Sequence, residues 1–305
     1  MSAQTSSTAG AFRTAVVPAA GLGTRFLPTT KAVPKELLPV VDTPGIELVA
    51  AEAAAAGADR LLIVTSPGKE SVAAYFRDDS ELVETLEARG KGALAEKIRR
   101  APGLLAVDSV YQYEPKGLGH AVAQAGPALA DDEQAVAVLL PDDLVLGSGG
   151  GDSGVLARMA EVRATHGGSV LCAFDIPREQ ISAYGVFDVS DTGDDDVKQV
   201  HGMVEKPDAE DAPSTFAAAG RYLLDRAIFD ALDRITPGSG GELQLTDAVA
   251  LLISEGHPVH VVVHSGGRHD LGNPAGYARA YVDFMLQHPE YGEDLRGWLT
   301  DRLKD

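Results

Sequence analysis

Short apolar runs alternate with amphipathic stretches through the first half of the chain. Four of these runs have the length of a buried strand, and they are Thr14–Ala20, Arg60–Ser66, Leu104–Gln112 and Ala135–Leu140. Stretches with helical spacing lie between them, at Ile46–Ala56, Glu81–Arg100 and Gly119–Ala130. The alternation predicts βαβ units and hence a doubly wound, Rossmann-like sheet.

The second half of the chain has a less regular pattern. Further strands are predicted at Ser169–Asp175, Val186–Ser190, Val197–Val204, Phe216–Leu224 and Val259–Val263. Helices are predicted at Val155–Thr165, Leu243–Ile253 and Ala275–Leu286. Taken together, the pattern predicts an α/β fold whose central sheet is mixed, mostly parallel and flanked by helices.

Two features bear on domain organisation. Residues 1–11 are small and polar, with neither a basic start nor an apolar run, so we expect a disordered leader there and not a secretory signal. The glycine-rich stretch Gly147–Gly154 is too short to mark a certain linker. We therefore expect a single domain over residues 12–305 that ends in a helical extension, although a division into two domains fits the pattern equally well.

Composition narrows the possible functions. The chain has 26 Lys and Arg residues against 45 Asp and Glu residues, and this net charge of −19 disfavours nucleic acids and anionic membranes as partners. The two signs balance within residues 1–100, so an anionic ligand would find positive charge there more easily. The single cysteine, Cys172, excludes an intramolecular disulfide framework, and no apolar run approaches the roughly 18 residues of a membrane span. We expect a cytoplasmic protein.

A glycine-rich turn follows the first predicted strand. It runs from Ala20 through Gly21, Gly23 and Thr24 to Arg25, and glycines allow backbone N–H groups to approach a phosphate closely. The turn is neither a Walker A loop nor a complete GxGxxG fingerprint. On the glycines alone, a phosphate site and a plain structural turn remain equally good interpretations.

Two lysines change that balance. Lys31 and Lys35 follow Arg25 within about ten residues, so three cations gather beside the glycine turn of an otherwise acidic chain. Such a cluster indicates a polyphosphate site, although isolated lysines are more often solvated surface charges.

Several motifs together resemble one enzyme family. The turn Gly21–Arg25, followed by Lys31–Pro39 (KAVPKELLP), resembles the signature of the sugar-nucleotide pyrophosphorylases. Four further stretches match the family in order, and they are Lys116–Ala121 (KGLGHA), Val204–Pro207 (VEKP), Gly241–Ala248 (GELQLTDA) and His269–Asn273 (HDLGN). Each stretch is weak evidence alone, but together the stretches are highly specific, and the resemblance covers roughly residues 13–300.

The resemblance implies a nucleotidyltransferase fold and a nucleotidyl transfer reaction. Pro34, Lys35 and Glu36 stand where thymidylyltransferases usually carry Ser-Lys-Gln, which favours uridine. The implied reaction joins UTP to α-D-glucose 1-phosphate, gives UDP-glucose and pyrophosphate, and uses Mg²⁺. The alternative is a thymidylyltransferase acting on dTTP. We expect a homodimer or homotetramer.

Candidate metal ligands follow from position and resemblance. Asp142 comes directly after the strand Ala135–Leu140, at the sheet edge where ligands bind in open α/β folds, and a carboxylate there can hold Mg²⁺. Asp142 matches the family's metal position. Asp270 matches a second carboxylate that supplies a metal ligand in related enzymes, with a loop-capping role as the competing interpretation. Asp143 is expected to point elsewhere.

The resemblance also assigns the cations and the sugar contacts. Lys206 is implied to contact the sugar phosphate and Glu205 the sugar hydroxyls, although two adjacent charges at a strand end are more often solvated. Arg25, Lys35 and Lys206 are the catalytic candidates. The candidate substrate-binding residues are Ala20, Gly21, Gly23, Thr24, Glu36, Gln112, Gly117, Gly185 and Glu205.

Other residues and other functions are weighed against these. The Gln112 amide suits the uracil edge, whereas His120 is interpreted as a packing residue, because an ionised phosphate needs no base. A dehydrogenase fits poorly, since the turn lacks the third glycine. A glycosyltransferase typically shows Asp-x-Asp, which is not the pattern at Asp142. A non-catalytic binding module is expected to have lost Asp142 or Lys206, and both are present.

Overall fold

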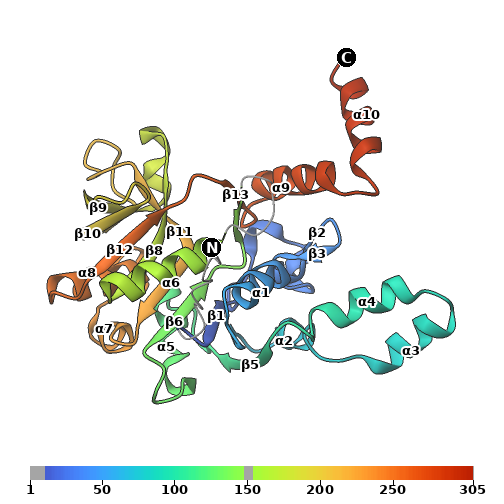
Figure 1. Cartoon of the computed structure of the whole chain (residues 1–305), viewed down its shortest axis with the longest axis horizontal. Coiled ribbons are helices and arrows are strands. Elements are labelled where there is room, and N and C mark those ends of the chain that lie inside the picture. Colours follow the sequence, from blue (N-terminus) through green and yellow to red (C-terminus); the bar gives the residue numbers. More distant parts are fainter. Residues whose placement is uncertain (1–10, 148–153, 305) are drawn as a thin grey trace, which may run out of the picture.

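A nine-stranded mixed sheet forms the centre of the fold in the computed structural model, which describes residues 11–147 and 154–304 (Figure 1). In spatial order its strands are β5 (Ala106–Tyr111), β4 (Arg60–Thr65), β1 (Thr14–Pro18), β6 (Ala135–Leu139), β11 (Phe216–Asp225), β8 (Ser169–Asp175), β12 (Val259–Val263), β10 (Val197–Glu205) and β9 (Gly185–Asp191). The expected leader over 1–11, apart from Ala11, and most of the stretch Gly147–Gly154 lie outside the described residues.

The sheet divides into two regions of different pairing. Strands β5, β4, β1 and β6 are all parallel, as the alternation of strands and helices predicts. Beyond them β11 is antiparallel to β6 and β8, β12 is parallel to β8, and β10 is antiparallel to β12 and β9. The expected predominance of parallel pairing is therefore not confirmed. The physical reason is that β8 to β11 follow one another without an intervening α-helix, which a parallel crossover between neighbouring strands usually needs. Only β9 and β10 are joined by a short connection, whereas β11 pairs with strands that are distant in the sequence.

Helices cover both faces of the sheet. Side chains alternate along each strand, so Ala15 and Val17 of β1 enter one core whereas Val16 enters the other. The first core includes residues of α1 (Gly45–Ala55) and α6 (Val155–His166), and the second includes residues of α5 (Leu118–Ala123), α7 (Ile228–Arg234) and α8 (Leu245–Ser254). The near-continuous apolar runs of the sequence follow from this burial on both faces.

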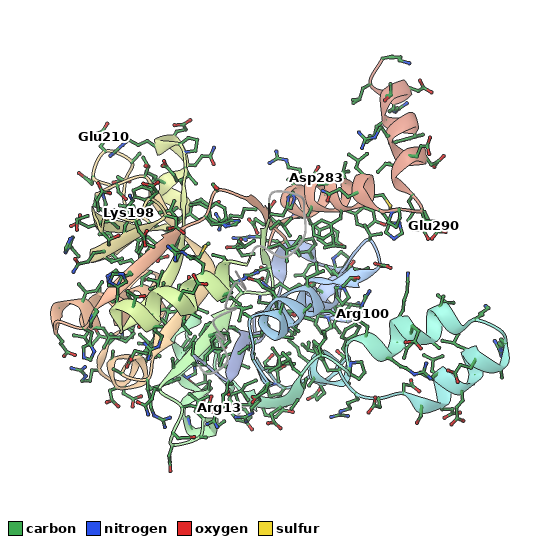
Figure 2. All side chains as sticks on the ribbon, in the orientation of Figure 1. Arg13, Arg100, Lys198, Glu210, Asp283 and Glu290 are labelled. Atoms are coloured by element: carbon green, nitrogen blue, oxygen red, sulfur yellow. The ribbon has the colours of Figure 1, made fainter. Side chains whose placement is uncertain are left out.

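Three short helices follow β4. They are α2 (Glu70–Ala74), α3 (Ser80–Ala88) and α4 (Gly92–Arg100), and the last two form a hairpin that extends away from the sheet (Figure 1). The single helix expected over 81–100 is broken at Gly90, whose φ of 69° suits a glycine turn. Arg100, the last residue of α4 (labelled in Figure 2), pairs with Glu47 of α1 and so connects the hairpin to that helix.

Smaller elements shape the edge of the sheet near the carboxyl ends of β1 and β6. Strands β7 (Asp143–Leu146) and β13 (Gly267–Asp270) pair with each other, as do β2 (Pro39–Val40) and β3 (Thr43–Pro44). These pairs are too short to give a clear sequence pattern. Helices α9 (Pro274–Gln287) and α10 (Gly292–Arg302) follow β13, and α10 stands away from the sheet (Figure 1). Within the described residues, no helix combines the length and apolar character that crossing a membrane requires.

Candidate active site

The glycine turn leaves β1 at the carboxyl edge of the sheet. Gly23 has a φ of 62°, and a Cβ there would lie only 3.2 Å from Thr30 and 3.3 Å from the Cβ of Lys35. The Thr30 hydroxyl donates a hydrogen bond of 2.8 Å to the Gly23 carbonyl. The turn is thus packed against the segment that carries Lys35, while Thr24 begins a short 3-10 helix of three residues.

The charged residues of this segment meet Asp142. Nζ of Lys35 lies 2.5 Å from Oδ2 of Asp142. Burial lowers the pKa of the Lys35 ammonium, but the charge and hydrogen bond of Asp142 outweigh burial, so that this pKa lies above its usual value. Lys35 is therefore cationic at neutral pH and is already aimed at the candidate metal ligand.

A second carboxylate lies beside Asp142. A Cβ built on Gly272 would lie 2.9 Å from Oδ1 of Asp270 and 3.2 Å from Oδ2 of Asp142, so the two carboxylates flank one glycine. Nη1 of Arg25 donates to the Gly272 carbonyl at 3.3 Å. The structure thus brings Arg25, Lys35, Asp142 and Asp270 together.

The two carboxylates differ in how many protein donors already satisfy them. Asp270 accepts hydrogen bonds from the Gly272 N–H at 2.7 Å and from Nδ2 of Asn273 at 2.6 Å, which is the arrangement of a loop cap. The Asp142 carboxylate accepts a hydrogen bond only from the Lys35 side chain among the described residues. The described residues contain no cluster of three or more His, Cys, Asp or Glu side chains suited to a metal. Hard oxygen donors in this small number fit Mg²⁺, which usually keeps waters and binds substrate phosphates as well.

Gln112 and Gly117 lie together at the end of β5. The buried Gln112 side chain donates to the Gly117 carbonyl at 3.1 Å, and its Nε2 lies 3.0 Å from Nδ1 of His120. Gly117 has a φ of 98°, and a Cβ there would approach the Leu243 carbonyl to 2.9 Å. His120 therefore packs against Gln112, in agreement with its predicted structural role.

Glu205 and Lys206 end β10 in an unusual conformation. Lys206 has a φ of +45°, which is uncommon for a residue with a Cβ. Its N–H donates to the Tyr184 carbonyl at 3.0 Å, and its Nζ pairs with Oε1 of Glu205 at 2.8 Å. A continued strand would point the two side chains to opposite faces, but the left-handed turn brings them together. Strain of this kind often marks a functional site.

A pocket of about 310 Å³ opens at this turn, within the size range of small-molecule sites. Gly185, Glu205 and Lys206 line it, and a Cβ on Gly185 would lie 3.3 Å from Oε2 of Glu205. Arg268, which belongs to none of the sequence motifs, also lines the pocket, with its guanidinium 4.7 Å from the Tyr184 ring centre.

A buried charge network supports the wall between the metal candidates and the pocket. Asp143 receives two hydrogen bonds of 2.8 Å from Arg268 and one of 2.7 Å from the Gly220 N–H. Arg221 is fully buried, pairs with Glu52 at 2.8 Å and donates to the Asp143 carbonyl at 2.7 Å. Asp143 therefore points away from its neighbour Asp142, as expected. Two adjacent residues of one turn thus have different places: Asp142 is a candidate metal ligand, and Asp143 belongs to the wall of the pocket.

Glu36 lies below the glycine turn. Its side chain is only 1% exposed, and Oε2 accepts a 2.8 Å hydrogen bond from Nζ of Lys69. Burial raises the pKa of the Glu36 carboxyl, and burial lowers the pKa of the Lys69 ammonium. Lys69 is a site residue that sequence reasoning missed, because a lysine after Pro67 and Gly68 looks like an exposed turn residue.

Comparison with known proteins identifies the family. Residues 14–285 match the nucleotidyl transferase family. The chain belongs to this family. Its relatives include the UTP–glucose-1-phosphate uridylyltransferase YngB of Bacillus subtilis (strain 168), which is 38% identical over 292 residues, or 96% of each chain. The resemblance to sugar-nucleotide pyrophosphorylases is thereby confirmed.

Solved structures agree with the assignment. A UTP-bound UGPase from Acinetobacter baumannii superposes with a TM-score of 0.86, is 36% identical, and the match covers 95% of this chain and 99% of that one. A UDP-glucose pyrophosphorylase complexed with UDP-glucose has a TM-score of 0.80 and 33% identity, over 91% of this chain and 100% of that one. The nucleotidyltransferase fold predicted from the motifs is confirmed.

Proposed function

We propose that the chain transfers a uridylyl group from UTP to α-D-glucose 1-phosphate, which yields UDP-glucose and pyrophosphate. The sequence-based prediction of this reaction agrees with the names of the relatives and with the ligands of the neighbouring structures. The observation that carries the proposal is the pairing of two sites at one sheet edge. A glycine turn with Arg25 and Lys35 meets Asp142, and the pocket of Glu205 and Lys206 opens beside Asp143.

The chemistry requires alignment and charge stabilisation without a protein nucleophile. A phosphate oxygen of glucose 1-phosphate attacks the α-phosphorus of UTP, and a new P–O bond forms. The bond from that phosphorus to the oxygen bridging to the β-phosphate breaks, and pyrophosphate leaves with both electrons of that bond. The attacking phosphate is largely ionised at pH 7, so no side chain has to accept a proton.

The cations have separate tasks in this reaction. Arg25 and Lys35 lie on the nucleotide side, where they hold the triphosphate and offset the charge of the departing pyrophosphate. Lys206 lies on the sugar side, draws the second anion towards the first and stabilises charge on the transferred group. Two anions that repel each other in water are thereby held in line.

Asp142 and Asp270 are the residues that would hold Mg²⁺, with Asp142 the stronger candidate because fewer protein donors satisfy it. When bound, the ion would neutralise phosphate charge and orient the triphosphate. The ion pair with Lys35 already fixes the orientation of the Asp142 carboxylate within the protein.

The remaining predicted residues bind the substrates, apart from Glu36, whose buried side chain pairs with Lys69 instead of reaching a substrate. Gln112 and Gly117, with the backbone of Ala20 and Gly21, form the site for uracil, while Gly23 and Thr24 offer backbone N–H groups to phosphate. Gly185 and Glu205 contact glucose at the pocket. The cytoplasmic location, the single-domain organisation and the homodimer or homotetramer stay predictions.

A nucleotide panel tests the function. Pyrophosphate release is measured for UTP, dTTP, ATP, CTP and GTP, each with glucose 1-phosphate, with and without Mg²⁺. Among these assays, we expect pyrophosphate release only in the one that contains both UTP and Mg²⁺. Strong release with dTTP would move the chain to the thymidylyl branch, and no release with any triphosphate would overturn the proposed activity.

A further inference from the structure

Lys69 uses its whole donor capacity inside the protein. It lies after β4 in the turn Ser66–Lys69, and its side chain is only 13% exposed. Its ammonium contacts three acceptors, which are the Ala19 carbonyl, the Gly21 carbonyl at 2.9 Å and Oε2 of Glu36 at 2.8 Å. A lysine has three N–H donors, so none is left for a substrate.

The two carbonyls belong to the start of the glycine turn. Ala19 also donates its N–H to the Val64 carbonyl at 2.7 Å, so residue 19 is fixed on both sides. Ala20 and Gly21 donate no backbone hydrogen bond to another described residue. Lys69 therefore immobilises the chain on either side of Ala20 and leaves the N–H groups of Ala20 and Gly21 available to a ligand.

Glu36 completes the anchor from the other side of the turn. It is buried, so its charge requires a close partner, and Lys69 supplies that partner. Glu36 is adjacent to Lys35, whose side chain contacts Asp142. One buried ion pair thus connects the base-binding end of the turn to the segment that carries the phosphate-binding lysine.

We propose that Lys69 is a positioning residue for the nucleotide, which fixes the glycine turn through the Ala19 and Gly21 carbonyls while Glu36 holds it in place. This inference rests on the proposed function, because it assigns Lys69 to the UTP side of that site. Lys69 acts through the backbone and touches neither substrate. Its loss is therefore expected to weaken UTP binding and base discrimination while the glucose 1-phosphate site stays intact.

The test is a pair of variants with a matched control. Lys69→Met removes the anchor but leaves Glu36 buried without a partner, so the double variant Lys69→Met/Glu36→Gln removes both charges together. The control is Lys97→Met. Lys97 lies on α4, and its substitution breaks an exposed lysine–carboxylate pair of 2.6 Å with Asp42. UTP affinity is measured by calorimetry, and KM for glucose 1-phosphate and the UTP/dTTP preference by pyrophosphate release.

We expect the double variant to bind UTP about tenfold or more weakly, the loss anticipated for two hydrogen bonds to a charged group, with KM for glucose 1-phosphate unchanged and a smaller UTP/dTTP preference. Lys69→Arg should recover part of the affinity. A folded double variant that binds UTP as tightly as Lys97→Met would overturn the assignment of Lys69. A wild-type protein that binds no UTP would overturn the proposed function as well, so the two failures are distinguishable.

Discussion

The proposed nucleotide side and the proposed sugar side of the site are held in place by different means. On the nucleotide side, the Lys35 and Lys69 ammonium groups pair with carboxylates, and their side chains are only 21% and 13% exposed. On the sugar side, Lys206 is 57% exposed and has Glu205 as its carboxylate partner. The first side is fixed by buried charge, whereas the second relies on a left-handed backbone turn.

The difference shows how one sheet can serve two substrates. The nucleotide side grows from the parallel strands β1, β4, β5 and β6, whose carboxyl ends gather loops at one edge. The sugar side grows from the antiparallel strands β9, β10 and β11, which supply residues from strand ends and from one hairpin. The buried network of Arg221, Glu52 and Asp143 lies between the two sides.

Breaking that network should produce the largest loss of stability, because the network lies between the two sides and supports both. Arg221→Met leaves Glu52 buried without a partner, so we expect a loss of about 3–5 kcal/mol in the free energy of unfolding. Denaturant unfolding measures this loss. Arg234→Met, which breaks an exposed pair with Glu255, should cost less than about 1 kcal/mol. Equal losses in the two variants would contradict a structural role for the network.

The exposed lysine of the sugar side should affect rate without affecting stability. Lys206→Ala should lower kcat about 10²–10³-fold, or roughly 2.7–4 kcal/mol, if Lys206 stabilises the transition state. The unfolding free energy should change little, because the side chain is mostly exposed. Lys198→Ala is the control, since Lys198, labelled in Figure 2, lies on β10, the strand that ends just before Lys206, and it pairs with Asp191. Turnover equal to that of the control would remove Lys206 from the reaction.

A substitution of Asp142, the stronger candidate for a metal ligand, tests the nucleotide side separately. Asp142→Asn removes the charge of the proposed metal ligand. The Mg²⁺ concentration for half-maximal activity should therefore rise about 10–100-fold or more, because even residues that only support a ligand have effects of that size. Asp132→Asn, at an exposed pair with Arg13, is the control. A Mg²⁺ titration distinguishes the two variants, and an unshifted midpoint in Asp142→Asn would exclude Asp142 as a ligand.

The base contact should give the smallest effect. Gln112→Ala removes one neutral amide, so we expect the preference for UTP over the other triphosphates to fall by a few-fold to about tenfold. The stability of the Gly117 turn has to be checked in parallel, because Gln112 also donates to the Gly117 carbonyl. An unaltered UTP preference in a folded variant would argue against the base contact.

The sequence predicts the elements of this fold better than their pairing. The strand Ser169–Asp175 agrees residue for residue with β8, because an apolar run buried on both faces leaves a clear pattern. Antiparallel pairing of β11 on both of its edges has no comparable signal, since pairing depends on contacts between distant segments. The nucleotide-side cluster was predictable because its cations lie close together in the sequence.

Residues whose role depends on burial were harder to predict. Lys69 and Arg268 look like ordinary surface charges in the sequence, and only the fold brings them to Glu36 and Asp143. Arg221 stands within the predicted strand Phe216–Leu224, and only the fold shows that its side chain is completely buried. The positive φ of Lys206 is also invisible in the sequence, because lysine has no preference for that conformation.

Calorimetric titration of UTP tests the division between the two sides most directly. The titration is made on the wild-type protein, on Lys206→Ala and on Lys69→Met/Glu36→Gln, without glucose 1-phosphate. We expect Lys206→Ala to bind UTP as the wild type does, because Lys206 serves the sugar side, and the double variant to bind UTP more weakly. Loss of UTP binding in Lys206→Ala, with wild-type affinity in the double variant, would contradict the division.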